Sequence, residues 1–410
     1  MRIASRYKLK PNGTVWTVPS ESDNDPYKVD PEAGRCTCPD SEIRRVKCKH
    51  QWAVELTMRR ETVKTVETTR NADGSTTKTV QKTTRTVKTA RVTYKQEWAA
   101  YNAAQTHEKD WFLSLLQGLC AGIPEPPQAM GRPRLPLADM VFCAAFKAYT
   151  RFSGRRFMCD LRYAHERGYI SRAPHYNSIF NYLEMASLTP ILRDLITVSS
   201  LPLRAVETDF ALDATGFGTT GTVTWFHKKY EHDVDNGDWI KAHMMCGVKT
   251  NVVTSVEISG RDDHDSPFLP ALVDATARNF AMREVSADKA YSSAKNLDVI
   301  ASHGAEPFIP FKSNVTGKGN TPLWRKMWAY YQFQRDDFLA HYHKRSNIES
   351  TNSMIKGKFG GKLWSKTDTG LINEALIKVL CHNICVLVQS IYELDIAPVF
   401  WAERPAVLGA

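Results

Sequence analysis

Apolar residues recur at helical spacing through the second quarter of the chain. From Glu97 to about residue 200, apolar runs such as 111–116 and 140–149 follow the period of an α-helix. A Pro-rich stretch at 124–136 interrupts them, as expected where proline removes the backbone N–H that a helix needs. The pattern therefore predicts a helical region over 97–200.

Short β-type runs replace the helical pattern after this region. They occupy residues 205–213, 221–226, 240–258, 283–288 and 305–311, before helical patterns resume at 323–357 and 370–394. Three adjacent strand candidates followed by strands separated by helices are typical of a mixed α/β sheet. The predicted fold class is therefore α/β, with a mixed-sheet domain over 201–400.

A threonine-rich segment carries most of the excess positive charge. The 410 residues include 54 Lys and Arg against 44 Asp and Glu, a formal net charge of +10, and residues 59–96 alone hold ten basic and three acidic residues. The run Asn71-Ala72-Asp73-Gly74 is a turn signal between two β-prone stretches of Thr and Val. We predict a basic hairpin or linker over 61–96, and its charge favours a polyanionic partner.

From the sequence we expect neither a signal peptide nor a membrane span. No apolar run follows the basic residues at the start, and the longest apolar region, 375–394, is interrupted by Lys378, His382, Asn383 and Gln389. Nine cysteines form an odd set, most of them scattered singly, which suits a reducing compartment. We expect a cytoplasmic protein.

Four potential metal ligands lie within fifteen residues, namely Cys36, Cys38, Cys48 and His50. Thiolate and imidazole ligands at four positions can close a tetrahedral zinc site, which stabilises a region too small for its own core. Burial as ordinary core residues is the alternative, and basic neighbours such as Arg45 disfavour it. The spacing resembles the CxC-xn-CxH pattern of the SWIM zinc finger, whose members bind DNA or protein. We predict a SWIM-type module with structural Zn²⁺ at residues 1–60.

Two aspartates are predicted at the ends of strands. If 205–213 is a strand, Asp213 shares one face with Asp209 and comes just before a Gly-containing turn. Asp288 ends the weaker β-type run at 283–288. A carboxylate in such a position is accessible to solvent and to a metal ion.

A helix supplies a third acidic group. At 100° per residue, four side chains fall within a wedge about 60° wide, namely Tyr342, Arg345, Glu349 and Lys356. An ordinary i,i+4 salt bridge explains Arg345 and Glu349 on a solvated helix but explains the other two less well. Three carboxylates can hold two Mg²⁺ ions about 4 Å apart, an arrangement that serves phosphoryl transfer.

The combined motifs resemble those of DDE transposases of bacterial and archaeal insertion sequences, of the broad family-four and family-five type. The helix matches their Y-x2-R-x3-E-x6-K signature, and the blocks DATGF at Asp213 and DKAY at Asp288 resemble their two aspartate blocks. The similarity covers residues 131–395. Trp324 and Trp328 lie between the second aspartate and the glutamate, where we predict packing in the core.

The resemblance implies an RNase H-like catalytic fold with Asp213 on the first strand, Asp288 on the fourth and Glu349 on a later helix. These three residues would bind two Mg²⁺ (or Mn²⁺) ions. The implied contacts to the DNA backbone at the transposon end are Tyr342, Arg345 and Lys356. The helical region 97–200 would bind DNA. The implied reaction is cleavage at the element ends followed by strand transfer into target DNA, performed by a dimer.

Two alternatives remain open at this point. A DNA-binding regulator descended from a transposase would use the zinc finger and the basic segment without cutting DNA. A structure-selective nuclease of the same fold would share the three acids. The first has no use for carboxylates that repel phosphates, and the second has no reason to carry the stripe of Tyr342, Arg345 and Lys356.

Overall fold

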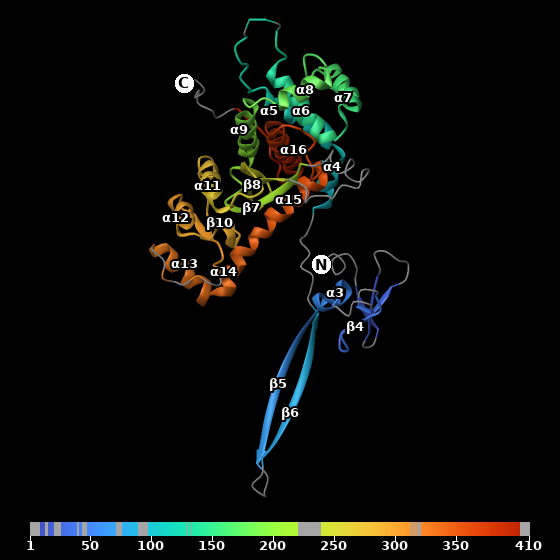
Figure 1. The fold of residues 1–410 in the computed structure, drawn as a ribbon, viewed down its shortest axis with the longest axis vertical. Coiled ribbons are helices and arrows are strands. Elements are labelled where there is room, and N and C mark those ends of the chain that lie inside the picture. Colours follow the sequence, from blue (N-terminus) through green and yellow to red (C-terminus); the bar gives the residue numbers. More distant parts are fainter. Residues whose placement is uncertain are drawn as a thin grey trace. The chain divides into compact units, whose positions relative to one another are not determined.

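The computed structural model places the chain in two compact units, Met1–Lys95 and Gln96–Ala410, which are described separately (Figure 1). The structure describes residues 9–12, 15–19, 26–38, 41–42, 47–70, 76–88, 97–128, 130–131, 133–219, 239–312, 315, 318 and 321–401.

The first unit begins with a small antiparallel sheet. Its strands, in the order β1-β2-β3-β4, are β1 (Lys10–Asn12), β2 (Val15–Val18), β3 (Tyr27–Asp30) and β4 (Arg35–Cys36). In β2, Trp16 and Val18 are buried and Thr17 is exposed, the alternation expected of a strand with one face covered. Helix α3 (Lys49–Thr57) packs against this sheet and adds Val54 to a small core.

A long two-stranded hairpin completes the first unit. Strands β5 (Met58–Arg70) and β6 (Thr76–Lys88) pair antiparallel from Met58 opposite Lys88 to Arg70 opposite Thr76. The structure thus has a hairpin in the basic segment, beginning three residues before the predicted 61. The predicted turn at 71–74 lies outside the described residues.

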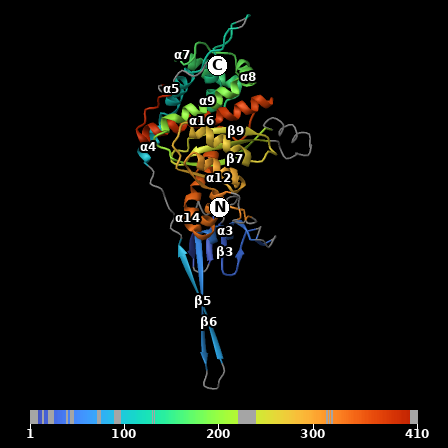
Figure 2. The same cartoon turned by 90° about the vertical axis from the view of Figure 1, so that its left-hand side faces the viewer.

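Helices fill the first part of the second unit, over the range predicted from periodicity. They are α4 (Trp98–Thr106), α5 (Glu108–Cys120), α6 (Leu137–Thr150), α7 (Gly154–Glu166), α8 (Tyr176–Leu183) and α9 (Leu188–Ser200). Several of them, including α4, α6 and α9, contact the long helix α16 (Asp368–Leu394) (Figures 1 and 2). These helices share one hydrophobic core with a face of the sheet that follows.

A five-stranded mixed sheet forms the centre of the second unit. Its order is β11-β10-β7-β8-β9, with bounds β7 (Asp209–Gly218), β8 (Trp239–Gly247), β9 (Val253–Ser259), β10 (Glu284–Ala287) and β11 (Glu306–Phe308). Strands β7, β8 and β9 pair antiparallel, whereas β10 is parallel to both β7 and β11. This arrangement confirms the predicted mixed α/β class.

The run predicted as one strand over 240–258 is two strands, because the chain turns at 248–252, where Asn251 adopts a left-handed conformation with φ of 66°. Because apolar residues lie on both sides of this turn, the hydrophobic pattern does not reveal it. The run at 221–226 lies outside the described residues.

Apolar side chains of the sheet alternate between its two faces, and helices pack on both. On one face, Phe210, Leu212 and Met245 belong to the core formed with α11 (Leu269–Ala277) and α12 (Ala294–Ser302). On the other face, Ala211 and Met244 belong to the core formed with α9, α15 (Ser346–Phe359) and α16. The connecting elements are η1 (Leu201–Leu203), η2 (Ser266–Phe268), η3 (Lys289–Tyr291), α13 (Pro322–Phe333), α14 (Arg335–Tyr342) and η4 (His343–Arg345).

Helix α16 has 27 residues and is apolar enough to cross a membrane by length and composition alone, yet 78% of its apolar window is buried inside the protein. It is therefore a core helix of this unit. Trp324 and Trp328 also pack against the core, and the Trp324 ring lies 4.8 Å from that of Phe311.

Candidate catalytic and zinc sites

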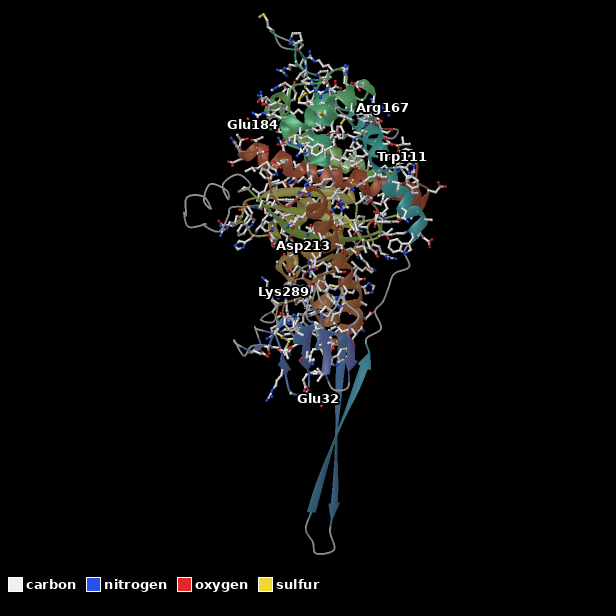
Figure 3. All side chains as sticks on the ribbon, turned by 90° about the vertical axis from the view of Figure 1, so that its right-hand side faces the viewer. Glu32, Trp111, Arg167, Glu184, Asp213 and Lys289 are labelled. Carbon is white, nitrogen blue, oxygen red and sulfur yellow. The ribbon has the colours of Figure 1, made fainter. Side chains whose placement is uncertain are left out.

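The first predicted acid, Asp213, lies in the middle of β7. The strand continues to Gly218, so the prediction that it ends at Asp213 is wrong; the glycines at 216 and 218 are accommodated within the strand. Asp213 pairs with Met244 in the register and shares a face with Ala211. Its side chain is 22% exposed. The carboxylate therefore lies on the central strand of the sheet (Figure 3) and is partly accessible to solvent.

The second predicted acid, Asp288, follows the last residue of β10. Ala287 is opposite Leu212 in the parallel pairing of β10 with β7, so the next residue on each strand is Asp288 and Asp213. Neighbouring strands lie about 4.8 Å apart, which places the two aspartates next to each other. Asp288 Oδ1 accepts a hydrogen bond of 2.7 Å from the backbone N–H of Lys289 and caps η3.

The third predicted acid, Glu349, lies in the first turn of α15, which contacts β7. Arg345 connects it to the sheet, because its Nη1 donates to Asp213 Oδ2 at 3.1 Å and its Nη2 donates to Glu349 Oε1 at 2.5 Å. The structure thus brings the three predicted acids together from two strands and a helix. Their roles as metal ligands stay predictions.

The electrostatics of Asp213 reflect this crowding. Burial raises the pKa of its carboxyl above the usual range, and the negative charges of Asp288 and Glu349 raise it further. Arg345 and the backbone N–H of Ala214 act in the opposite direction. Three carboxylates so arranged need positive charge close by, which is the environment of a hard cation with oxygen ligands.

The predicted stripe of DNA contacts is not on one helix. Tyr342 ends α14 and Arg345 ends η4, so the uniform 100° step holds only within α15, where Glu349 and Lys356 do share a face. Burial raises the pKa of Tyr342, and the charge of Arg345, whose guanidinium lies 5.9 Å from the centre of the Tyr342 ring, acts in the opposite direction. Burial lowers the pKa of Lys356, and its ammonium lies 5.7 Å from the centre of the Phe217 ring.

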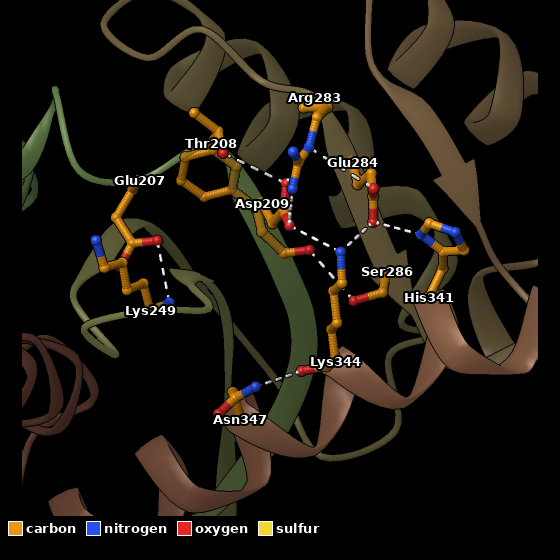
Figure 4. A network of polar contacts seen from close by, with 11 residues as sticks. Glu207, Thr208, Asp209, Lys249, Arg283, Glu284, Ser286, His341, Lys344 and Asn347 are labelled. Atoms are coloured by element: carbon orange, nitrogen blue, oxygen red, sulfur yellow. Dashed lines mark hydrogen bonds and ion pairs between the residues drawn. The ribbon is translucent and has the colours of Figure 1, made fainter. Parts of the chain in front are cut away.

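A charged network beside the three acids was not predicted. Lys344 Nζ donates to Asp209 Oδ2 at 2.8 Å and to Glu284 Oε2 at 2.7 Å, so it joins the first residues of β7 and β10 (Figure 4). Arg283 donates to Asp209 at 2.6 Å, and His341 Nδ1 lies 2.9 Å from Glu284 Oε2. The network holds η4, and with it Arg345, against the end of the sheet at which β7 and β10 begin.

His243 and Asp263 have structural roles in this unit. His243 is buried, its Nε2 lies 2.8 Å from Ser259 Oγ, and its ring stacks on Phe268. Burial lowers the pKa of His243, so the imidazole is neutral at neutral pH. Asp263 of the acidic run at 262–265 accepts a hydrogen bond from the N–H of Gly260 and so stabilises a turn.

The four predicted zinc ligands form a compact, buried cluster. The ligand atoms of Cys36, Cys38, Cys48 and His50 all lie within 4.8 Å of one another. His50 Nδ1 is 3.8 Å from both Cys36 Sγ and Cys48 Sγ. Tetrahedral zinc with bonds of about 2.0–2.3 Å requires ligand atoms about 3.5–3.8 Å apart. The geometry therefore suits a four-coordinate structural ion.

Secondary structure and a glutamine hold this cluster. Cys36 ends β4, while Cys48 directly precedes α3 and His50 lies in its first turn. Gln51 accepts a hydrogen bond of 2.8 Å from the N–H of Cys48 and donates one of 2.6 Å to the carbonyl of Gly34. Gln51 thereby ties the helix to the turn that directly precedes β4 and Cys36, a contact that the ligand spacing alone could not indicate.

Two parts of the chain match known protein families. Residues 204–384 match a family described as the transposase DDE domain, and this range contains Asp213, Asp288 and Glu349. Residues 23–58 match the SWIM zinc finger. The resemblance inferred from the motifs is confirmed: the chain carries a DDE transposase domain preceded by a SWIM zinc finger. Together with the Cys₃His cluster, this match supports structural zinc, and both domains imply DNA binding.

Proposed function

We propose that this protein is a DNA transposase of an insertion sequence, which cleaves the ends of its element to free a 3′-hydroxyl and joins that hydroxyl to target DNA. The observation that carries the proposal is the position of Asp288 beside Asp213 on parallel strands, with Glu349 linked to Asp213 through Arg345. The matched DDE domain supports transposase chemistry in general.

The three carboxylates suit two Mg²⁺ or Mn²⁺ ions, because hard divalent cations take oxygen ligands. Bound there, such ions stabilise charge on the attacking and leaving oxygens of a phosphodiester. Asp213 would supply an oxygen ligand from β7, Asp288 one from the position directly after β10, and Glu349 one from α15. Arg345 offsets part of the negative charge of the acids.

Basic and aromatic groups next to the acids would position DNA. We propose that Tyr342, Arg345 and Lys356 contact the backbone at the element end, because guanidinium and ammonium groups bind phosphates strongly. The helical region at 97–200 and the zinc finger would add further DNA contacts. Holding two element ends at once requires two active sites, so we propose a homodimer in the DNA complex, acting in the cytoplasm of a prokaryotic cell.

A regulator that only binds DNA, or a nuclease that joins no strands, is less well supported. Three clustered carboxylates repel phosphates unless cations neutralise them, so a protein that only binds DNA would gain nothing from them. A nuclease would share them, and the formation of joined products separates these two activities.

The decisive experiment measures cleavage and strand transfer on DNA containing the element end, with Mg²⁺. We expect Asp288→Ala to lose cleavage by at least a hundredfold while its affinity for the same DNA stays within a few-fold of the parent, because a metal ligand is lost and the DNA surface is kept. Asp262→Ala is the matched control, since the side chain of Asp262 is 97% exposed and belongs to another loop. Equal cutting by Asp288→Ala and the parent would contradict the proposal.

A further inference from the structure

A tryptophan stands exposed on the loop that follows α15. The loop spans residues 360–367, and the side chain of Trp364 is 61% exposed. Its neighbour Leu363 is completely buried. Large aromatic side chains usually bury most of their surface, so an exposed tryptophan next to an anchored leucine requires an explanation.

Two charged residues of α16 fix the backbone of this loop. Lys378 Nζ donates to the carbonyl oxygens of Gly360 at 3.1 Å and Lys362 at 2.6 Å. Glu374 Oε2 accepts hydrogen bonds of 2.8 Å from the backbone N–H groups of Trp364 and Ser365. The carbonyls before the tryptophan and the N–H groups around it are therefore held from the same helix.

Lys378 and Glu374 thus form a clamp on the backbone of this loop, and their buried ion pair and strand β7 make the clamp rigid. Lys378 and Glu374 lie 3.6 Å apart, with side chains only 4% and 14% exposed. Burying charges is unfavourable unless they are paired and hydrogen-bonded, and here the loop backbone provides the remaining partners. Gly218, the last residue of β7, also exchanges backbone hydrogen bonds of 3.0 and 2.8 Å with Gly361 and Leu363. Trp364 is thus presented on a preorganised support.

Cationic side chains surround this support. A Cβ atom placed on Gly360 would lie 3.2 Å from the Arg151 guanidinium, and one placed on Gly361 would lie 3.7 Å from Lys356. Both basic side chains therefore lie against the loop. Lys362 and Lys366 flank Trp364 in sequence and are exposed. Asp368, at the start of α16, is the exposed acidic residue that directly follows the loop.

Positive charge around an exposed aromatic ring is the chemistry that binds unpaired nucleotides, because the ring stacks on a base and the cations hold the adjoining phosphates. We propose that Trp364 stacks on an unpaired DNA base, with Arg151, Lys356, Lys362 and Lys366 holding the backbone. This inference rests on the proposed function, since it concerns DNA bound at the same catalytic domain.

The position of the loop limits which nucleotide it reaches. Ten residues of α15 separate Glu349 from Phe359, about 15 Å along the helix, and five residues of β7 separate Asp213 from Gly218, about 17 Å along the strand. Trp364 would therefore meet a base further along the strand, and not the nucleotide whose phosphodiester the three acids hold.

The test measures the affinity of the zinc-loaded full chain for two fluorescein-labelled probes, a single-stranded 20-mer of thymidine and a 20-base-pair duplex. Losing one base–aromatic stack weakens single-strand binding about tenfold, so we expect that loss for Trp364→Ala and less than a twofold change for the duplex. Trp364→Phe should retain most of the affinity. Phe333→Ala is the matched control, because Phe333 is 82% exposed in the same unit and lies outside the regions proposed to bind DNA.

Other outcomes would overturn the proposal. Unchanged single-strand affinity in Trp364→Ala would exclude stacking, and an equal loss for both probes would make Trp364 a general contact to the DNA backbone. A change in oligomeric state with unchanged DNA affinity would assign the ring to a protein contact. If the parent bound neither probe, the proposed function itself would fail together with this inference.

Discussion

Arg345 shows how one side chain can organise a group of acids. Its guanidinium contacts Asp213 on β7 and Glu349 on α15, and the preceding residue, Lys344, contacts Asp209 and Glu284. Burial alone would lower the pKa of Arg345, but the charge of Asp213 and the contact with Tyr342 raise it. Two consecutive cations thus attach α15 to two positions on the sheet, which sets the distance between Glu349 and the aspartates.

The Asp209 contact predicts a pH-dependent contribution to stability. Burial alone would raise the pKa of Asp209, but hydrogen bonds from Arg283 and Lys344 lower it below its ordinary value. A carboxyl whose pKa is lowered on folding stabilises the fold fully above its unfolded pKa of about 3.9 and loses that contribution as the pH falls through its folded pKa. We expect Asp209→Asn to cost about 1.5–3 kcal/mol in the free energy of unfolding at pH 7.

Urea unfolding of the parent and of Asp209→Asn, at several pH values from 7 down to 3, measures this difference. The difference should stay constant down to about pH 4 and then shrink. Asp262→Asn, at an almost fully exposed carboxylate, should have no such effect. A difference that grows as the pH falls would contradict the assigned role of Asp209.

The sequence grouped the three acids because their spacing matches a known signature; in the structure Asp288 is next to Asp213, and Arg345 links Asp213 to Glu349. The network of Lys344, Asp209 and Glu284 could not be predicted in the same way. Lys344 is 135 residues from Asp209 in sequence, and their contact depends on the register of β10 against β7 and on the turn at η4. Sequence patterns indicate faces of strands and helices but not the pairing of particular ions across them.

At the scale of elements, periodicity located most helices and strands but not the breaks inside apolar runs. The turn at 248–252 separates two buried strands, and the change from α14 through η4 to α15 occurs within a continuous helical pattern. A one-turn 3₁₀ segment keeps nearly the same spacing of apolar residues as an α-helix, so the pattern cannot reveal it. That break redirects Tyr342 relative to Glu349.

The clamp on the loop after α15 gives a prediction at this scale. Lys378→Ala leaves Glu374 as a buried charge without its partner, so we expect a loss of about 3–5 kcal/mol in the free energy of unfolding. The double variant Lys378→Met with Glu374→Gln should lose less than Lys378→Ala, because the unpaired charge is removed with it. Denaturant unfolding monitored by circular dichroism measures both.

Lys366→Ala is the control, because Lys366 is exposed on the same loop. It should change stability by less than about 0.5 kcal/mol. A double variant less stable than Lys378→Ala would show that the ion pair itself, and not the relief of an unpaired charge, dominates the energetics of the clamp.

At the scale of the whole molecule, the two compact units differ in what holds them together. The second unit has two large hydrophobic cores on either side of its sheet. The first unit has a small core that includes three of the four predicted zinc ligands, Cys36, Cys38 and Cys48. Folding of such a small module is expected to depend on its metal ion.

Removal of zinc should therefore unfold one unit and spare the other. We expect chelation with EDTA to abolish hydrogen-exchange protection in residues 26–57 while the protection of β7, β8 and α16 stays unchanged, and Cys48→Ser to act in the same way. Cys159→Ser, at an exposed cysteine of the second unit, is the control. Retained protection in residues 26–57 after complete loss of zinc would show that the small core suffices.

The hairpin of β5 and β6 is long compared with one turn of duplex DNA. Thirteen residues in each strand extend about 44 Å, which is longer than one turn of duplex DNA, about 34 Å. A two-stranded ribbon on its own is only marginally stable in water, so lying along a nucleic acid would strengthen its pairing. Its amide exchange would then report occupancy, slowing when the ribbon lies on a duplex and quickening when it is released.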